Sequence, residues 1–273
     1  MNLKFLEYEP PKHLSPYIKS FWTLKRDGKD NLPFNFSPIS DGIPGLVFQL
    51  NDDQSFLDKE KQILPKAFLY GQTVKRREMI WTGDINTIGV HFYPSSLKAI
   101  FGFNANIITD TCVEFELIST KEYQFLHEQL CNNESTLEQI SLLSNYFLSL
   151  ITKNNSHNPS VAFAIEKIEK SNGQLSYGEL ITDLKISERS LERHFKRHVG
   201  ITPKMFMRIC RFQSSLHQLN KKGYQKLSDI AYENGYSDQS HFIREFKEFL
   251  GFSPLQFFKK QDNLIVEITK MMR

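Results

Sequence analysis

Two segments of this chain share one residue pattern about fifty positions apart, and this repeat constrains the fold more than any other feature. The first segment covers residues 175–203 and the second covers residues 227–254. Each contains a short helical pattern, a tight joint and a longer helical pattern, which ends at a glycine followed by a proline. This is the layout of a helix-turn-helix, so the sequence predicts two such units with recognition helices at 187–198 and 238–249.

The second unit has the small and aromatic residues that such packing requires. Ala231 allows two helices to approach closely, and Gly235 supplies the turn between them. Large apolar residues are spaced to bury together at Ile230, Tyr236, Phe242, Phe246 and Phe249.

The recognition helix of each unit has one apolar face and one polar face. If Leu191 and Phe195 point inward, the helical spacing puts Arg189 and Arg193 on the outer face, with Lys196 nearby. With Phe242 and Phe246 inward, the outer residues are Gln239, Ser240, Ile243 and Arg244. Arginine can pair with guanine and glutamine with adenine in the major groove, so we predict contact with double-stranded DNA, a solvated helix face being the plainer alternative.

The charge distribution agrees with this prediction. Residues 161–273 hold 19 Lys and Arg against 13 Asp and Glu, whereas residues 1–160 hold 15 against 18. Only the C-terminal part is basic, and a modest positive excess supports nucleic-acid binding weakly on its own.

Residues 229–254 resemble the signature of the AraC/XylS family of transcription regulators. They fit the pattern Asp-Ile-Ala-x-x-x-Gly-Tyr-Ser-Asp-Gln-Ser-x-Phe-x-Arg-x-Phe-Lys-x-x-x-Gly-x-Ser-Pro throughout, and the resemblance covers about residues 158–260. It implies a sequence-specific DNA-binding regulator, in which a central helix at about Pro203–Leu219 holds the two units at a fixed separation. Arg211 matches an arginine that is usual in that helix.

The resemblance also implies DNA-contacting residues. Together with the exposed Lys196, the expected contacts are Arg189, Glu192 and Arg193 in the first recognition helix and Gln239, Ser240, His241 and Arg244 in the second. The first unit departs from the family pattern: Ile181 and Ser215 stand where alanine is common, and Lys185 stands where glycine is frequent. The departures at Ile181 and Lys185 put the detailed geometry of the first turn in question.

The N-terminal part has the texture of a β-domain. Short aromatic and β-branched runs separated by turn formers predict strands at 21–24, 45–50, 67–70, 79–82 and 87–93, arranged as an antiparallel barrel or sandwich. Phe21-Trp22, Asp41-Gly42, Gly71-Gln72 and the run 90–94 are similar to the cupin-like sensory domains of one branch of the family. The expected fold is therefore two-domain, mainly β with added helices and then all-α.

Helices are expected at 95–101, 119–131 and 135–152, the last two opened by Ser-x-x-Glu capping boxes at Ser119 and Ser135. The third has a broad apolar face made of Leu137, Ile140, Leu143, Leu148 and Ile151, which suits a core or a partner chain. The polar run 154–160 ends in proline and marks the boundary between a sensory domain at 1–153 and a DNA-binding domain at 158–273.

The sequence offers no catalytic site, so we expect no enzyme, cofactor or metal. His91 stands alone on its strand, without a second ligand, and the His194–His198 pair more plausibly belongs to a helix surface. The candidate effector pocket is Trp22, Phe48, Tyr70, Trp81 and His91, although strand aromatics more often simply fill a barrel. An RNA-binding module is less favoured, because the phenylalanines sit at core spacing and are not placed for base stacking.

The remaining expectations concern location and partners. The scattered Cys112, Cys131 and Cys210 indicate reduced packing residues, and no stretch suits an export signal or a membrane span, so we expect a cytoplasmic protein that makes no membrane contact. The expected partners are double-stranded DNA, a small-molecule effector, a second copy of the chain, and RNA polymerase if the protein is an activator.

Overall fold

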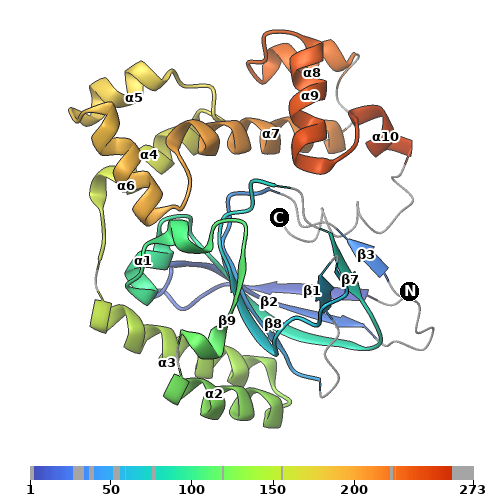
Figure 1. The fold of residues 1–273 in the computed structure, drawn as a ribbon, viewed down its shortest axis with the longest axis vertical. Helices are drawn as coiled ribbons and strands as arrows, with labels where there is room; N and C mark the ends of the chain where they lie inside the picture. The colour runs from blue at the N-terminus through green and yellow to red at the C-terminus, as the bar shows by residue number, and fades with distance from the viewer. Residues whose placement is uncertain are drawn as a thin grey trace.

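The computed structural model describes residues 3–26, 34–36, 40–51, 56–58, 60–75, 78–118, 120–154, 156–221, 224 and 226–259. A β-sheet lies in the middle of the molecule, with α2 (Thr120–Asn132) and α3 (Thr136–Asn154) on one side and the helical C-terminal segment along the opposite side (Figure 1). We refer to β1 through α3 as the N-terminal part and to α4 through α10 as the C-terminal part. None of the helices in these ranges combines the length and apolar character that crossing a bilayer requires.

The larger sheet has six strands in the order β1-β2-β8-β4-β6-β9, and all its pairings are antiparallel. Its strands are β1 (Leu3–Tyr8), β2 (Ile18–Arg26), β4 (Gly45–Gln49), β6 (Ala67–Tyr70), β8 (Ile85–Phe92) and β9 (Cys112–Glu114). A second sheet, in the order β3-β7-β5, comprises β3 (Phe34–Phe36), β7 (Met79–Trp81) and β5 (Phe56–Asp58). The predicted antiparallel β-domain is confirmed, as an open barrel of two separate sheets; β1, β3, β5 and β9 had not been predicted.

The larger sheet is apolar on both faces. Trp22, Val47 and Phe68 meet Phe56 and Trp81 of the smaller sheet in one cluster. Side chains of the opposite face pack in a second cluster against α1 (Ser96–Phe101), α2 (Thr120–Asn132) and α3 (Thr136–Asn154). The short 3-10 helices η1 (Ala105–Ile108) and η2 (Phe115–Leu117) complete this layer. A strand buried on both faces has a continuous apolar run, as β4 does at Leu46, Val47 and Phe48.

Two details of the predicted helices differ in the structure. On α3, Ile140, Leu143 and Ile151 are buried, whereas Leu137 and Leu148 are 72% and 41% exposed, so the apolar face is wider than the core that covers it. The capping box at Ser135 is half formed: its Oγ accepts a long 3.5 Å bond from the Glu138 amide, while its own amide donates to Asn133. Ser119 lies outside the described residues.

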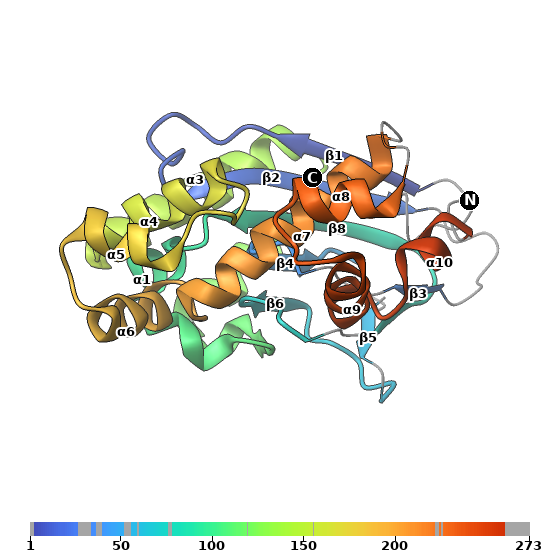
Figure 2. The same cartoon turned by 90° about the horizontal axis from the view of Figure 1, so that it is seen from above.

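The C-terminal part is entirely helical among its described residues. It comprises α4 (Pro159–Lys170), α5 (Tyr177–Leu184), α6 (Glu188–His198), α7 (Pro203–Lys221), α8 (Leu227–Glu233), α9 (Gln239–Leu250) and α10 (Pro254–Lys259). The long α7 runs between the unit formed by α5 and α6 and the unit formed by α8 and α9, as both views show (Figures 1 and 2). One apolar cluster extends through this part, to which the N-terminal part contributes only the half-buried Val74 among the described residues.

Candidate nucleic-acid interface

The first unit is shaped by side chains that cap its helices. Ser176 and Glu179 form a complete capping box at the start of α5, and the Ser187 hydroxyl accepts from the Ser190 amide at the start of α6. Between them Lys185 adopts the left-handed conformation, with φ 51° and ψ 35°. A residue with a Cβ therefore holds a conformation that glycine adopts without strain.

The two faces of α6 are those that the spacing predicts. Leu191 and Phe195 are fully buried, whereas Arg189, Arg193 and Lys196 are exposed and Glu192 is half-buried. The prediction of a helix-surface histidine pair is wrong for His198, which is buried with 7% exposure. It lies on the side of α6 that packs against α1 and η1, because α6 meets the N-terminal part along its inner side.

The second unit repeats this design with stronger caps. Gly235 takes the left-handed conformation at φ 72°, and Asp238 Oδ1 accepts a 2.8 Å bond from the His241 amide at the start of α9. That bond is the main cause of the lowered pKa of Asp238. The predicted core of the unit is confirmed, since its aromatic residues are all buried: Tyr236, Phe242, Phe246 and Phe249. Gln239, Ser240 and Arg244 are exposed and Ile243 is half-buried.

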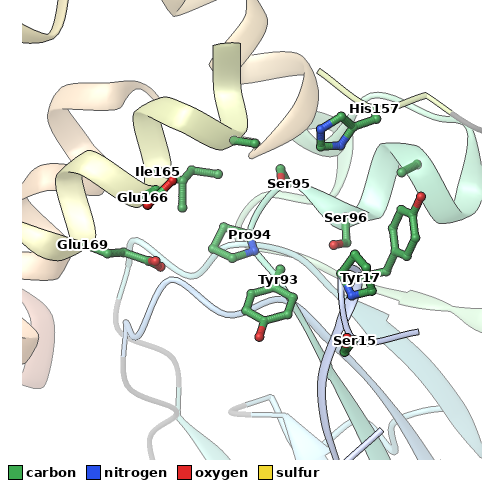
Figure 3. Close-up of a pocket in the computed structure, with 13 residues that line it drawn as sticks. Ser15, Tyr17, Tyr93, Pro94, Ser95, Ser96, His157, Ile165, Glu166 and Glu169 are labelled. Carbon is green, nitrogen blue, oxygen red and sulfur yellow. The ribbon is translucent and has the colours of Figure 1, made fainter. Parts of the chain in front are cut away.

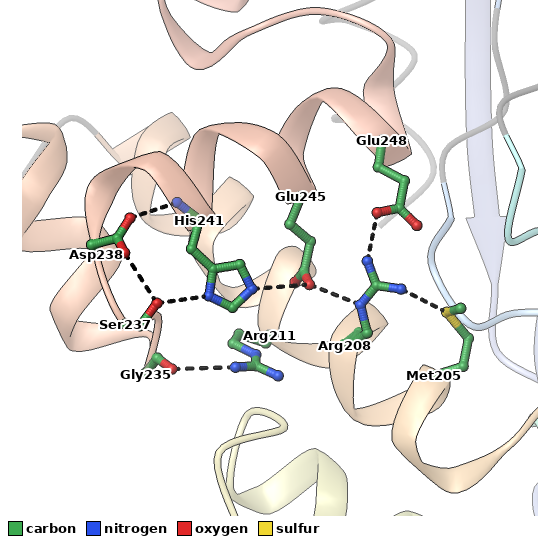
Figure 4. Close-up of polar contacts among 9 residues, drawn as sticks. All are labelled: Met205, Arg208, Arg211, Gly235, Ser237, Asp238, His241, Glu245 and Glu248. Carbon is green, nitrogen blue, oxygen red and sulfur yellow. Dashed lines mark hydrogen bonds and ion pairs between the residues drawn. The ribbon is translucent and has the colours of Figure 1, made fainter.

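His241 differs from the other predicted contact residues because its ring turns along its own helix. Its Nδ1 lies 3.2 Å from Ser237 Oγ, and its Nε2 lies 4.0 Å from Glu245 Oε2 (Figure 4). The ring also packs edge-on against Tyr236. To contact a base, His241 would have to leave these partners.

A charge network that sequence reasoning missed joins α7 to α9. Arg208 Nε donates to Glu245 Oε2 at 2.9 Å, and Arg208 Nη2 donates to Glu248 Oε2 at 2.6 Å (Figure 4). The Glu245 side chain is only 2% exposed, so the ion pair between Arg208 and Glu245 is shielded from solvent on its carboxylate side. No motif signals it, because the partners are 37 and 40 residues apart in the chain.

Arg211 supplies a second connection between α7 and the second unit. Its Nη1 donates to the Gly235 carbonyl at 3.2 Å, and its guanidinium lies 5.3 Å from the Tyr236 ring centroid. The turn of the second unit is thereby attached to α7. The first unit meets α7 through Phe195 and Phe206 and through an exposed ion pair between Glu188 and Lys204.

The exposed cations of the recognition helices have a different status. Within the described part of the chain, Arg189, Arg193, Lys196 and Arg244 make no hydrogen bond and no ion pair. The arginines of α7 thus have a structural role, whereas the cations of the recognition helices remain available to a ligand. We call the latter the available set. An available set on two recognition helices can bind anionic groups such as phosphates or pair with base edges.

The candidate effector residues do not share one cavity. Trp22 and Trp81 belong to the cluster between the two sheets, where Tyr70 packs against it. His91 lies on the same face, 5.6 Å from Trp22 between ring centroids. Phe48 points to the opposite face and packs against Phe115. Neighbouring positions on a strand alternate between the two faces, and the strand register determines which residues of adjacent strands lie on the same face.

His91 is held by polar neighbours. Its Nδ1 lies 3.3 Å from Ser20 Oγ, which in turn donates to Glu7 at 3.0 Å. His91 Nδ1 also lies 3.7 Å from Glu7 Oε1, and its interaction with this carboxylate is the main cause of the lowered pKa of Glu7. The described residues contain no group of three or more His, Cys, Asp or Glu arranged to hold a metal ion. None of the three cysteines, all of which are among the described residues, forms a disulfide, and Cys131 is exposed, contrary to its expected packing role.

The contacts between the two parts had no signal in the sequence. Thr109 Oγ1 donates to the Gly200 carbonyl at 2.8 Å, and Gln213 Nε2 donates to the Ser40 carbonyl at 2.7 Å. A Cβ at Gly42 would lie 3.1 Å from the Phe206 ring, so the backbone here passes directly over α7. The first recognition helix and α7 are therefore both fastened to the N-terminal part.

Comparison with known proteins gives matches to both parts. Residues 180–260 match a family described as a helix-turn-helix domain, and residues 6–114 match a domain of unknown function. An uncharacterized HTH-type transcriptional regulator of Haemophilus influenzae is 27% identical over 149 residues, half of each chain. The HTH-type transcriptional activator RhaS of an Enterobacter species is 31% identical over 85 residues, which is 31% of this chain and 30% of RhaS. The chain thus spans half or less of the length of these relatives.

Among solved structures, ToxT from Vibrio cholerae is similar to this chain at 15% identity and a TM-score of 0.46, over 95% of this chain and 98% of ToxT.

Proposed function

We propose that the chain is a sequence-specific regulator of transcription of the AraC/XylS type that binds double-stranded DNA through its C-terminal part. The observation that carries the proposal is the set of exposed cations without partners on α6 and α9. Desolvating a cation already engaged in an ion pair would cost binding energy, whereas Arg189, Arg193, Lys196 and Arg244 are available.

The proposed contacts fall into two blocks. Arg189, Glu192, Arg193 and Lys196 read one block through α6, and Gln239, Ser240, His241 and Arg244 read the other through α9. Major grooves on one side of a duplex recur about every 34–36 Å, so two recognition helices held by α7 would read blocks about one turn apart. The attachment of α7 to α9 through Arg208, and to the turn of the second unit through Arg211, supports a fixed spacing.

We further propose that residues 158–273 form the DNA-binding domain and residues 1–153 the sensory domain. The nearly self-contained apolar cluster of the C-terminal part supports this division. A fragment of residues 158–273 should fold and bind DNA, although it would expose Phe206 where Gly42 now covers it.

The partner proposals extend to a second copy of the chain and to an effector. Leu137 and Leu148 are exposed on α3 and lie about three helical turns apart, so they share a face that a second copy could cover. An effector bound in the N-terminal part would reach the DNA-binding helices through the contacts of Thr109 and Gly42. RNA polymerase is the further partner if regulation is activation.

The decisive experiment is selection of bound sequences from a random duplex library by the full chain, followed by fluorescence anisotropy on the enriched site. We expect two short conserved blocks with a fixed spacer and tighter binding to that site than to random duplex at equal salt. Equal affinity for selected and random duplexes would contradict sequence-specific recognition.

A further inference from the structure

A cavity of about 250 Å³ lies where the N-terminal part meets α4 (Figure 3). The N-terminal part contributes the segment before β2, including Tyr17, and the segment from β8 into α1, including Tyr93 and Ser96. Helix α4 contributes Glu166 and Glu169. The cavity is therefore closed by residues from both parts, about 70 or more positions apart in the chain.

Ser96 presents an unsatisfied polar group to this cavity. The residue is only 3% exposed, and its hydroxyl makes no hydrogen bond to any described residue. Its amide is already satisfied by the Tyr93 carbonyl. A ligand in the cavity can therefore form a hydrogen bond with this hydroxyl.

The charge of the lining selects the class of ligand. No lysine or arginine lines the cavity, whereas two glutamates and one histidine, His157, do. Glu166 is already paired with Lys170. Glu169 is an exposed residue that forms no ion pair with a described residue; partial burial of its carboxyl group raises its pKa, and the charge of Lys19 opposes this rise. A carboxylate in this position is stabilised by a cation that enters the cavity.

We propose that this cavity binds a small aliphatic amine, whose ammonium group pairs with Glu169 while its chain lies against Tyr17 and Tyr93 and its polar end reaches the Ser96 hydroxyl. Ammonium and carboxylate form a charge-assisted hydrogen bond, and tyrosine rings attract cations at their faces. The cavity is slightly smaller than typical pockets for drug-sized ligands of roughly 300–1,000 Å³, which suits a short amine.

Occupancy of this cavity has a regulatory consequence, which rests on the proposed function. Because its walls belong to both parts, an amine bridging them favours the arrangement in which α4 stays against the start of α1. This arrangement also packs α6 against α1 and η1. The amine thus changes the placement of the DNA-binding helices only to the extent that it binds this arrangement more tightly than other arrangements.

The test is isothermal titration calorimetry on the full chain without DNA, at pH 7.5, with putrescine as the probe. Succinate and 1,4-butanediol serve as matched anionic and neutral probes of similar length. We expect putrescine to bind the unaltered chain and the other two probes not to bind. Glu169→Gln should weaken putrescine binding at least tenfold and Ser96→Ala by a smaller factor. The matched control Glu128→Gln removes an exposed carboxylate from α2, outside the cavity, and should leave binding unchanged.

Three results would overturn the proposal: no putrescine binding to the unaltered chain, equal binding to Glu169→Gln, or equal binding of succinate. Anisotropy with the selected duplex separates this proposal from the proposed function. A chain that binds its duplex but no amine contradicts the amine site alone. A chain that binds putrescine through Glu169 but no DNA contradicts the proposed function alone.

Discussion

The hydroxyl of Thr109 donates a 2.8 Å hydrogen bond to the carbonyl of Gly200, two residues beyond the end of the first recognition helix. The bond spans 91 positions of the chain and joins the N-terminal part to the turn between α6 and α7. A movement of the N-terminal part at Thr109 would therefore be transmitted through Gly200 to α6 and α7.

Replacing Thr109 with valine keeps the shape of the side chain and removes the donor. We expect this change to weaken the contact between the two parts by about 1 kcal/mol, since the Gly200 carbonyl loses its partner. Hydrogen exchange of the amides at 198–202 should become faster. The matched control Thr182→Val removes a hydroxyl-to-carbonyl bond inside α5 and should leave exchange at 198–202 unchanged.

Arg193→Ala and Arg244→Ala test the DNA-contacting faces. Each should cost about 1–3 kcal/mol of binding at the selected site and relax base preference within one block, if the side chain meets base edges. The melting temperature should barely change, because both residues are exposed and unpartnered among the described residues. Lys12→Ala, an exposed cation of the N-terminal part, is the control. Unchanged affinity of both arginine variants for every duplex would mean that the wrong face has been assigned.

Phe246→Ala should behave in the opposite way. Its side chain is fully buried and packs with Phe212, Phe242 and Phe257, so its loss leaves a cavity worth about 3–5 kcal/mol of stability. Thermal unfolding should shift downward, and affinity for selected and random duplexes should fall together. A variant that melts normally yet loses only specific binding would contradict a structural role for Phe246.

Burial of His198 predicts a loss of stability in acid. Burial is the main cause that lowers its pKa from 6.5 to about 4, and the charges of Lys98, His157, His194 and Arg197 add to the effect. The unfolded chain therefore binds more protons than the folded protein between these two values, so stability falls as the pH falls below about 6.5. The expected loss from this residue between pH 7 and pH 5 is at most about 2 kcal/mol.

The measurement is urea unfolding of the unaltered chain and of His198→Gln at both pH values. The carboxylates titrate equally in the two proteins, so the difference between their pH dependences isolates His198. An identical pH dependence would show that His198 is not held neutral by its surroundings.

Lys185→Gly should stabilise the chain by about 1 kcal/mol. Lys185 occupies the left-handed conformation, which costs a residue with a Cβ roughly 1–2 kcal/mol, and part of the relief is lost to the greater freedom of glycine in the unfolded chain. Lys247→Gly, at an exposed helical position of α9, should instead destabilise it by about 1 kcal/mol. Thermal unfolding of the two variants compares them directly, and a lower melting temperature for Lys185→Gly would contradict the strain argument.

Local chemistry written in the sequence determined the elements of the C-terminal part. Gly235 and Gly251 follow the ends of α8 and α9, and Pro254 begins α10. The backbone preferences of glycine and proline need no distant partner, so these helix ends could be predicted from the sequence. Leu191 and Phe195 fix which side of α6 turns inward, and the helical period then fixes that Arg189 and Arg193 face outward. The same reasoning located five strands of the N-terminal part.

Only the tertiary structure decided what lies between these elements. Burial of His198, the bond from Thr109 to Gly200 and the pairing of Arg208 with Glu245 each depend on segments that are far apart in the chain. Phe48 does not lie with the other predicted effector residues, because it is on the opposite face of the sheet. That placement depends on strand register, which no single strand encodes. The cavity beside Glu169 has walls from both parts, so it exists only once they pack together. Periodicity reports how a residue lies on its own element, whereas a site between elements depends on how the whole chain folds back on itself.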